Sequence, residues 1–166
     1  HKQDATIPPT RLAVTHGDLH GDNLFVDAGH AWVIDYEHSG PGPILRDVTE
    51  LEVDILTRLV VPEHVGQSDF YALATALARP TDPEAALLVL ISPGADQEIT
   101  KALHTIQSLR TLAHQAIQIR DMREYYWGLL LDALFVGLLR ATPAFQRERA
   151  LILSAVLCKR LDHWKG

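Results

Sequence analysis

The sequence predicts an α+β fold that is mainly α, with a small β-hairpin segment followed by about six helices. Three observations support this prediction. The chain has 166 residues, the size of one domain with its own core. Short apolar runs separated by polar turns occupy the first 43 residues, as expected of strands. After Pro43, apolar residues recur every three to five positions, as on the buried face of a helix.

The N-terminal part predicts three short strands. Residues 1–10 are polar and end in two prolines, so they are expected to be a linker or a remnant ahead of a single domain, 11–166. Apolar runs predict the strands, and a polar connection containing glycine predicts a hairpin between the second and third. The Ser-Gly-Pro-Gly-Pro segment, 39–43, is expected to form neither helix nor strand. The predicted strands span 12–15, 24–26 and 31–34.

The rest of the chain, 44–166, is predicted to be a helical body. Its helices are bounded by proline, glycine or polar turns, which cannot continue an apolar helical pattern. The longest nearly apolar stretch, 127–139, has 13 residues, which is too short to cross a membrane. The six predicted helices span 44–61, 67–79, 84–92, 95–119, 123–140 and 143–164.

Charge and cysteine content limit the classes of ligand and of structural site that the sequence allows. Acidic residues outnumber basic ones by 21 to 15, so the net charge is −6, which disfavours binding to nucleic acid or to an anionic membrane. One cysteine, Cys158, allows no internal disulfide and no cysteine zinc cage, and we expect it to lie in the core. No secretory signal is visible, so a cytoplasmic location is expected. Residue 1 is His, and the chain is expected to be a piece of a longer protein.

The residues that point to chemistry gather between positions 16 and 38. His16 and Asp18 form a His-x-Asp pair, and Asn23, the only asparagine of the chain, follows five positions after Asp18. Asp35 comes directly after the predicted hairpin. Phosphoryl transfer needs a carboxylate that orients the acceptor hydroxyl and oxygen ligands that hold Mg²⁺ on the phosphates of a nucleotide. An Asp, an Asn and a second Asp at this spacing can supply both.

Residues 16–27 and 33–37 resemble the catalytic and metal-binding segments of the aminoglycoside phosphotransferase and choline kinase-like family, a branch of the protein-kinase-like fold. The resemblance implies that Asp18 is the catalytic base and that His16 orients its loop. It also implies that Asn23 and Asp35 bind Mg²⁺ and, through it, ATP. It further implies that Asp47 opens the next helix and ties back the loop. A fainter likeness is to kinase-like domains of bacterial multi-protein conflict systems.

The chain lacks the nucleotide-binding features of this family's N-terminal lobe. The family's N-terminal lobe carries a nucleotide-covering loop and a phosphate-binding lysine, whereas none of the four lysines here lies on a strand-like run. The prolines of 39–43 remove the backbone donors that a phosphate loop needs. Arg46 replaces a more usual neutral residue before Asp47. We therefore expect the chain to be the C-terminal lobe alone, with 11–43 as catalytic loop and metal-binding hairpin, inactive without its N-terminal lobe.

The predicted function is ATP- and Mg²⁺-dependent transfer of the γ-phosphoryl group to a hydroxyl of an aminoglycoside-like or choline-like small molecule. Its expected partners are that substrate and the N-terminal lobe, and a homodimer stays open. One alternative is a non-catalytic, kinase-like binding or regulatory module. A second is a metal hydrolase, because imidazole and carboxylate groups suit zinc; its ligands would come from His16, His20, Asp22, Glu37 and His38.

The other conspicuous residues have ordinary structural interpretations. His20 is expected to pack within the loop, and His30 to lie on the exposed hairpin turn. Tyr125, Tyr126 and Trp127 are expected to lie in the core or at contacts between helices and not to stack on a substrate. The acidic run is interpreted as a solvated helix face whose early acids favour the helix dipole. It comprises Asp47, Glu50, Glu52 and Asp54.

Overall fold

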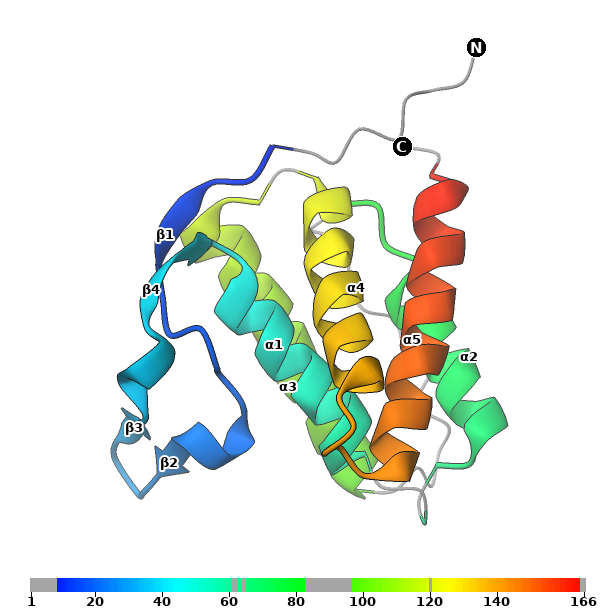
Figure 1. Cartoon of the computed structure of the whole chain (residues 1–166), viewed down its shortest axis with the longest axis horizontal. Helices are drawn as coiled ribbons and strands as arrows, with labels where there is room; N and C mark the ends of the chain where they lie inside the picture. The colour runs from blue at the N-terminus through cyan, green and yellow to red at the C-terminus, as the bar shows by residue number, and fades with distance from the viewer. Residues whose placement is uncertain (1–8, 61–62, 64, 83–96, 120, 165–166) are drawn as a thin grey trace.

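The strands and the helices of the computed structural model lie on different sides of the molecule (Figure 1). The structure describes residues 9–60, 63, 65–82, 97–119 and 121–164. Four short strands and their loops occupy one side, and helices α1 to α5 form the rest (Figure 1). The predicted fold class, α+β and mainly α, is confirmed.

The first and last strands, β1 (Leu12–Thr15) and β4 (Gly40–Pro43), form an antiparallel two-stranded sheet. The prediction that 39–43 forms no strand was therefore wrong. The amide of Ile44 donates to the carbonyl of Arg11 at 2.9 Å, and backbone donors alternate along a strand, so the two glycines of β4 also face β1. The two prolines then lie where their missing N–H groups would point to the open edge, the one place in a sheet that tolerates them.

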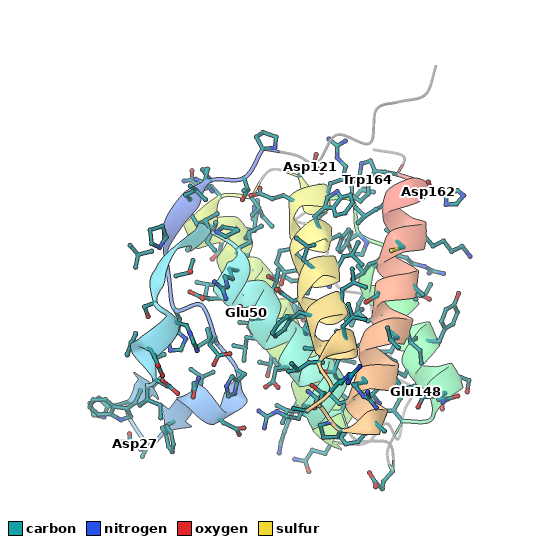
Figure 2. All side chains as sticks on the ribbon, in the orientation of Figure 1. Asp27, Glu50, Asp121, Glu148, Asp162 and Trp164 are labelled. Atoms are coloured by element: carbon teal, nitrogen blue, oxygen red, sulfur yellow. The ribbon has the colours of Figure 1, made fainter. Side chains whose placement is uncertain are left out.

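The predicted hairpin is present as β2 (Leu24–Val26) and β3 (Ala31–Val33), which are antiparallel. The carboxylate of Asp27 closes its turn by accepting from the amides of Gly29 and His30, each at 2.9 Å. His30 is exposed on this turn, as predicted. The hairpin reaches away from the helices, and Asp27 marks its far end (Figure 2).

Five of the six predicted helices are confirmed, and the third, 84–92, lies outside the described residues. The first, α1, continues into a π-helical turn, η3 (Ile55–Leu59), and α3 into another, η4 (Ala113–Ile117). Within the described residues, no helix is long and apolar enough to cross a membrane. The helices are α1 (Arg46–Asp54), α2 (Gln67–Leu77), α3 (Gln97–Leu112), α4 (Met122–Leu138) and α5 (Ala144–Asp162).

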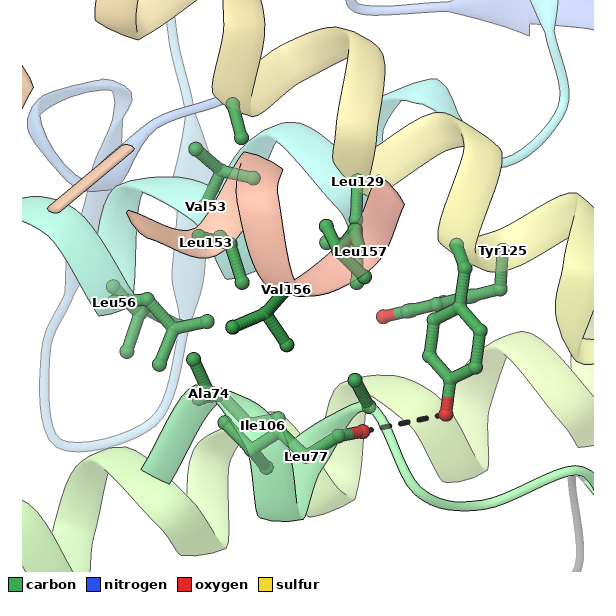
Figure 3. Close-up of a cluster of buried hydrophobic side chains, with 14 of the residues drawn as sticks. Val53, Leu56, Ala74, Leu77, Ile106, Tyr125, Leu129, Leu153, Val156 and Leu157 are labelled. Carbon is green, nitrogen blue, oxygen red and sulfur yellow. Dashed lines mark hydrogen bonds between the residues drawn. The ribbon is translucent and has the colours of Figure 1, made fainter. Parts of the chain in front are cut away.

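The core lies between these helices and is made of apolar side chains at helical spacing (Figure 3). On α2, for example, Phe70, Ala74 and Leu77 share one face and are buried. Tyr125 and Tyr126 of α4 have no exposed surface, which confirms their predicted place in the core. Cys158 was wrongly predicted to be buried: it is exposed, because α5 turns other positions inward.

A buried ion pair joins α1 to α3 within this core. Glu52 has no exposed surface, and its carboxylate accepts from Arg110 at 2.5 and 3.0 Å and from the hydroxyl of Tyr125 at 2.6 Å. Burial alone would lower the pKa of Arg110, but the charge of Glu52 raises it, so the guanidinium stays charged. Arg110 also donates to the carbonyl of Leu77 at 2.7 Å, so one side chain connects three helices.

We expect Arg110→Met to lower the free energy of unfolding by about 3–5 kcal/mol, because it leaves the Glu52 carboxylate buried without its counter-charge. Urea denaturation followed by circular dichroism measures the change. The double variant Glu52→Gln/Arg110→Met should recover most of the loss, since neither buried charge remains. Equal stability of wild type and Arg110→Met would contradict the central role of this pair.

Candidate functional site

The loop between β1 and β2, residues 16–23, runs along one face of α1, and we call it the candidate loop. It makes its first attachment through Asp47. One carboxylate oxygen of Asp47 accepts from the amide of His16 at 2.9 Å, and the other accepts from the amide of Gly17 at 3.0 Å. Asp47 thus ties the loop to the first turn of α1, as the family resemblance implied.

Two more carboxylates of the same helix continue this attachment. Glu50 accepts from the amide of Leu19 at 3.0 Å, and Asp54 accepts from the amide of Gly21 at 2.9 Å. Positions 47, 50 and 54 follow the i, i+3, i+7 spacing that puts side chains on one helix face. Figure 2 shows Glu50 on the side of α1 nearest the loop. The solvated-face interpretation of the acidic run was wrong, because this face binds the loop and Glu52 lies in the core.

Two arginines of the same segment complete the attachment. Arg46 donates to Glu50 at 2.7 Å and also to the carbonyl of Gly17. Arg58 donates to Asp54 at 2.7 and 2.8 Å and to Asp22 at 2.9 Å. The hydrogen bond with Glu50 raises the pKa of Arg46, and the one with Asp54 raises the pKa of Arg58. Both arginines therefore balance the charge of the carboxylates that hold the loop.

Gly17 allows the sharp turn at the start of the candidate loop. Its φ of +84° is in the left-handed region that only glycine adopts freely. A Cβ atom at this position would collide with the carbonyl oxygen of His38. The loop and the segment before β4 therefore approach each other closely, and the hydroxyl of Ser39 donates to the carbonyl of His16 across the same gap at 3.3 Å.

The side chain of Asp18 is not used to attach the candidate loop to α1. Its side chain is 49% exposed, although the amides on both sides of it, those of Gly17 and Leu19, are bonded to α1. The Nε2 atom of His20 lies 3.8 Å from the Asp18 carboxylate. A carboxylate that is half exposed on a fixed backbone can accept a hydrogen bond from a group that approaches from solvent.

Asn23 is buried at the end of the loop, where its side-chain amide is oriented by two acceptors. The Nδ2 group donates to the carbonyl of Asp18 at 3.0 Å and lies 3.3 Å from Nε2 of His20. The Nδ2 group of Asn23 therefore makes its contacts within the protein. The Oδ1 atom is then the group left for a ligand, and an amide oxygen is a ligand type that Mg²⁺ accepts.

Asp35 is brought to the loop through its two neighbours in sequence. The imidazole Nε2 of His16 bonds to the carbonyl of Ile34 at 2.7 Å, and the amide of Ile34 donates to the carbonyl of Asn23 at 3.1 Å. The ring of Tyr36 lies 5.0 Å from the ring of His16. Asp35 itself is exposed and has a left-handed backbone with φ +63°, an uncommon conformation that concentrates at functional sites.

Three of the four predicted site residues therefore lie on the candidate loop, and the fourth, Asp35, is linked to it through Ile34 and Tyr36 and not through its own side chain. The zinc alternative gains no support. Within the described ranges, no group of three or more His, Cys, Asp or Glu side chains is arranged to hold a metal ion. His20 instead lies among Asp18, Asp22 and Asn23, as expected of a histidine that packs within the loop. The donors that remain for Mg²⁺ are an amide oxygen and a carboxylate, a set that this ion prefers to bind together with phosphate oxygens.

Sequence reasoning missed Asp132, a carboxylate of α4 behind the α1 attachment. Its Oδ2 atom is buried and has no hydrogen-bond partner among the described residues. Burial raises the pKa of Asp132 to about 7, and the nearby charge of Glu50 adds to this rise. An aspartate within an apolar run, 127–139, was the one signal in the sequence that a carboxylate is buried here.

Comparison with known proteins gives one family. The model of the family described as ternary complex associated domain 9 matches residues 2–135 of the 166. This region includes the candidate loop, the hairpin and helices α1 to α3, and it ends within α4. No curated protein and no solved structure matches the chain.

We expect Asp47→Ala to speed the hydrogen exchange of the His16 and Gly17 amides by roughly 10- to 100-fold, because a bond to a charged acceptor contributes about 1.5–3 kcal/mol. Exchange followed by NMR measures the rate at each amide. Asp69→Ala removes an exposed carboxylate from the first turn of α2 and is the matched control. Unchanged exchange at both amides in Asp47→Ala would contradict the attachment described above.

We expect Asp132→Asn to stabilise the protein by an amount that grows with pH. The pKa of Asp132 is raised in the folded state, so ionising it costs folding free energy, and that cost increases between about pH 4 and pH 7. The stability difference between variant and wild type should rise by about 2–4 kcal/mol over this range and then stay constant. Urea denaturation at several pH values measures it, and a difference that does not vary with pH would contradict the burial of the charge.

Proposed function

The chain belongs to the ternary complex associated domain 9 family, and we propose that it supplies the catalytic lobe of an ATP-dependent phosphotransferase acting on a hydroxyl group of a small molecule. One observation carries the proposal. Four amides of the candidate loop are fixed by α1, while the Asp18 carboxylate between them stays half exposed. Fixing the backbone and exposing the carboxylate lowers the entropy lost when a hydroxyl is positioned for reaction.

In the proposed reaction, Asp18 orients the acceptor hydroxyl and takes its proton. The acceptor oxygen forms a bond to the γ-phosphorus of ATP while the bond from that phosphorus to the β–γ bridging oxygen breaks, and ADP leaves. The role of His16 is to position, since its ring bonds to the Ile34 carbonyl and so holds the loop to the segment that carries Asp35. The net charge of −6 favours a cationic acceptor of the aminoglycoside or choline type.

The residues suited to hold Mg²⁺ in this proposal are Asn23, through Oδ1, and Asp35, through its carboxylate. The Nδ2 group of Asn23 contacts Asp18 and His20, which leaves Oδ1 for the ion. The two neighbours of Asp35, Ile34 and Tyr36, both contact His16 of the candidate loop. Bound Mg²⁺ would neutralise the phosphate charge and keep the phosphates oriented. Asn23 and Asp35 would bind ATP through this ion, and the hydrogen bonds of Asn23 and Ile34 would set its place relative to Asp18.

The proposed enzyme needs a second lobe for the rest of the nucleotide. The described lysines, Lys101 and Lys159, lie on helices and away from the strands. The strands expose apolar side chains that a neighbouring lobe would cover, with Phe25 and Trp32 each 56% exposed. The N-terminal lobe is therefore the partner proposed for this surface, and the chain alone is expected to be inactive. A cytoplasmic location is part of this proposal, since ATP is the proposed phosphoryl donor.

A second candidate function is a non-catalytic, kinase-like binding module. The exposed apolar side chains of β1 and the hairpin favour it, because such a surface suits a protein partner. The family description, which refers to a ternary complex, is compatible with this alternative. A homodimer through the same surface is one form of it.

The test is Mg²⁺-dependent ADP production by the full-length protein that contains this chain, with a panel of aminoglycosides, amino alcohols and sugars as acceptors. We expect Asp18→Asn to lower the rate by about 10²- to 10⁴-fold, the usual contribution of a general base, with an unchanged circular dichroism spectrum. Asp69→Asn, on the exposed first turn of α2, is the matched control and should keep full activity. Full activity of Asp18→Asn would overturn the proposed mechanism. No activity in the folded wild type would favour the binding module.

A further inference from the structure

A cavity on the other side of the molecule from the hairpin combines positive charge with an apolar floor. It lies between α2 and α5 and has a volume of about 340 Å³ (elements in Figure 1). Among the described residues that line it, three are arginine or lysine, a fourth is His163 and none is acidic, although the chain carries a net charge of −6. The carboxylate of Asp162 lies beside the cavity, 3.6 Å from Nδ1 of His163. The basic lining residues are Arg79, Lys159, Arg160 and His163. A local charge opposite in sign to that of the whole protein attracts anions.

Arg160 is held in place before any ligand arrives. Its guanidinium donates to the carbonyl of Ala78 at 3.0 Å and to that of Arg79 at 3.4 Å, at the C-terminal end of α2. It also lies 4.3 Å above the ring of Trp164, near the end of α5 (Figure 2). A guanidinium fixed in this way loses little entropy when its remaining N–H groups bind an anion.

Arg79 and Lys159 have no such structural role. Across the part of the chain that the structure describes, neither side chain has a carboxylate within 4.0 Å, the distance of an ion pair. The backbone carbonyl of Lys159 lies 2.9 Å from Nδ1 of His163, and this contact leaves the ammonium group of Lys159 unused. Two unpaired cations beside a fixed arginine make a site that a doubly charged group, such as a phosphate monoester, would satisfy.

The remaining walls suit a flat apolar body. Tyr71 lines the cavity and is 48% exposed, while Ala78 and Val156 form a buried apolar part of its lining. Thr75 also lines it, and its buried hydroxyl has no hydrogen-bond partner among the described residues. A polar group left without a partner in an apolar floor is costly, so a ligand that reaches it after a rotation of the side chain gains a hydrogen bond.

We propose that the cavity between α2 and α5 binds a small phosphate monoester with an aromatic body, at a site separate from Asp18 and its loop. The phosphate binds Arg79, Lys159 and the free N–H groups of Arg160, and the ring lies against Tyr71. A volume of about 340 Å³ is within the usual range for small-molecule sites. The site is independent of the proposed phosphotransferase activity and holds its ligand without reacting with it.

The test is isothermal titration calorimetry of the full-length protein with phenyl phosphate, which has the required groups and is not a nucleotide. We expect saturable binding by wild type and by Asp18→Asn, because the candidate loop takes no part. Phenol and inorganic phosphate, each lacking one half of the ligand, should bind at least about tenfold more weakly. Lys159→Gln and Arg79→Gln should each weaken phenyl phosphate binding by about tenfold or more.

Arg140→Gln is the matched control, because Arg140 is an exposed arginine beyond the end of α4 that does not line the cavity, and it should bind like wild type. The proposal is overturned if wild type shows no saturation up to roughly 10 mM phenyl phosphate. It is also overturned if Lys159→Gln and Arg79→Gln both bind as tightly as wild type. Loss of binding in Asp18→Asn would assign the ligand to the candidate loop and would contradict the separate site.

Discussion

The attachment of backbone amides to carboxylates of one helix is the interaction on which the rest of this structure depends. Apart from one 3-10 turn, Gly21–Asn23, the candidate loop has no regular structure that would satisfy its N–H groups, and a buried amide without a partner is costly. Asp47, Glu50 and Asp54 provide the acceptors at one helical spacing. The loop therefore takes the shape that the face of α1 dictates, and this shape leaves the Asp18 side chain directed elsewhere and half exposed.

The same helix couples this loop to the core. While its outer face binds the loop, its inner face carries Glu52, which is paired with Arg110 and Tyr125 away from solvent. Asp132 of α4 lies close enough to this face for the charge of Glu50 to raise the pKa of Asp132 and for the charge of Asp132 to raise the pKa of Arg46. Since α1 is fixed from the inside by a buried ion pair, the carboxylates on its outside have fixed positions as well. Stability of the core and geometry of the site are thus two consequences of one helix.

The sequence predicted the helices and strands better than it predicted which parts of the molecule cover them. Apolar periodicity located β1, the hairpin and all of the helices within the described residues, because periodicity reports which side chains share a face. It does not report what covers that face, which is why the acidic run of α1 was interpreted as solvated. The strand β4 was missed for a related reason: proline excludes a strand only where its N–H would be needed, and sequence alone does not show which edge of β4 faces β1. Cys158 and Asp132 were misjudged or missed because burial of a single helical position depends on neighbouring helices.

The cluster of His16, Asn23 and Asp35 shows how the spacing in the sequence becomes a spatial relation. A hairpin returns the chain to its starting point, so the residues before β2 and after β3 must be neighbours. Ile34 follows the hairpin and makes two hydrogen bonds to the candidate loop. Its carbonyl bonds to the imidazole of His16, and its amide donates to the carbonyl of Asn23. Asp35 has a left-handed backbone, with φ +63°, between an anchored Ile34 and a Tyr36 ring that packs against His16. The backbone on both sides of Asp35 therefore sets where this residue lies, while its own carboxylate is exposed and makes no hydrogen bond to the described residues.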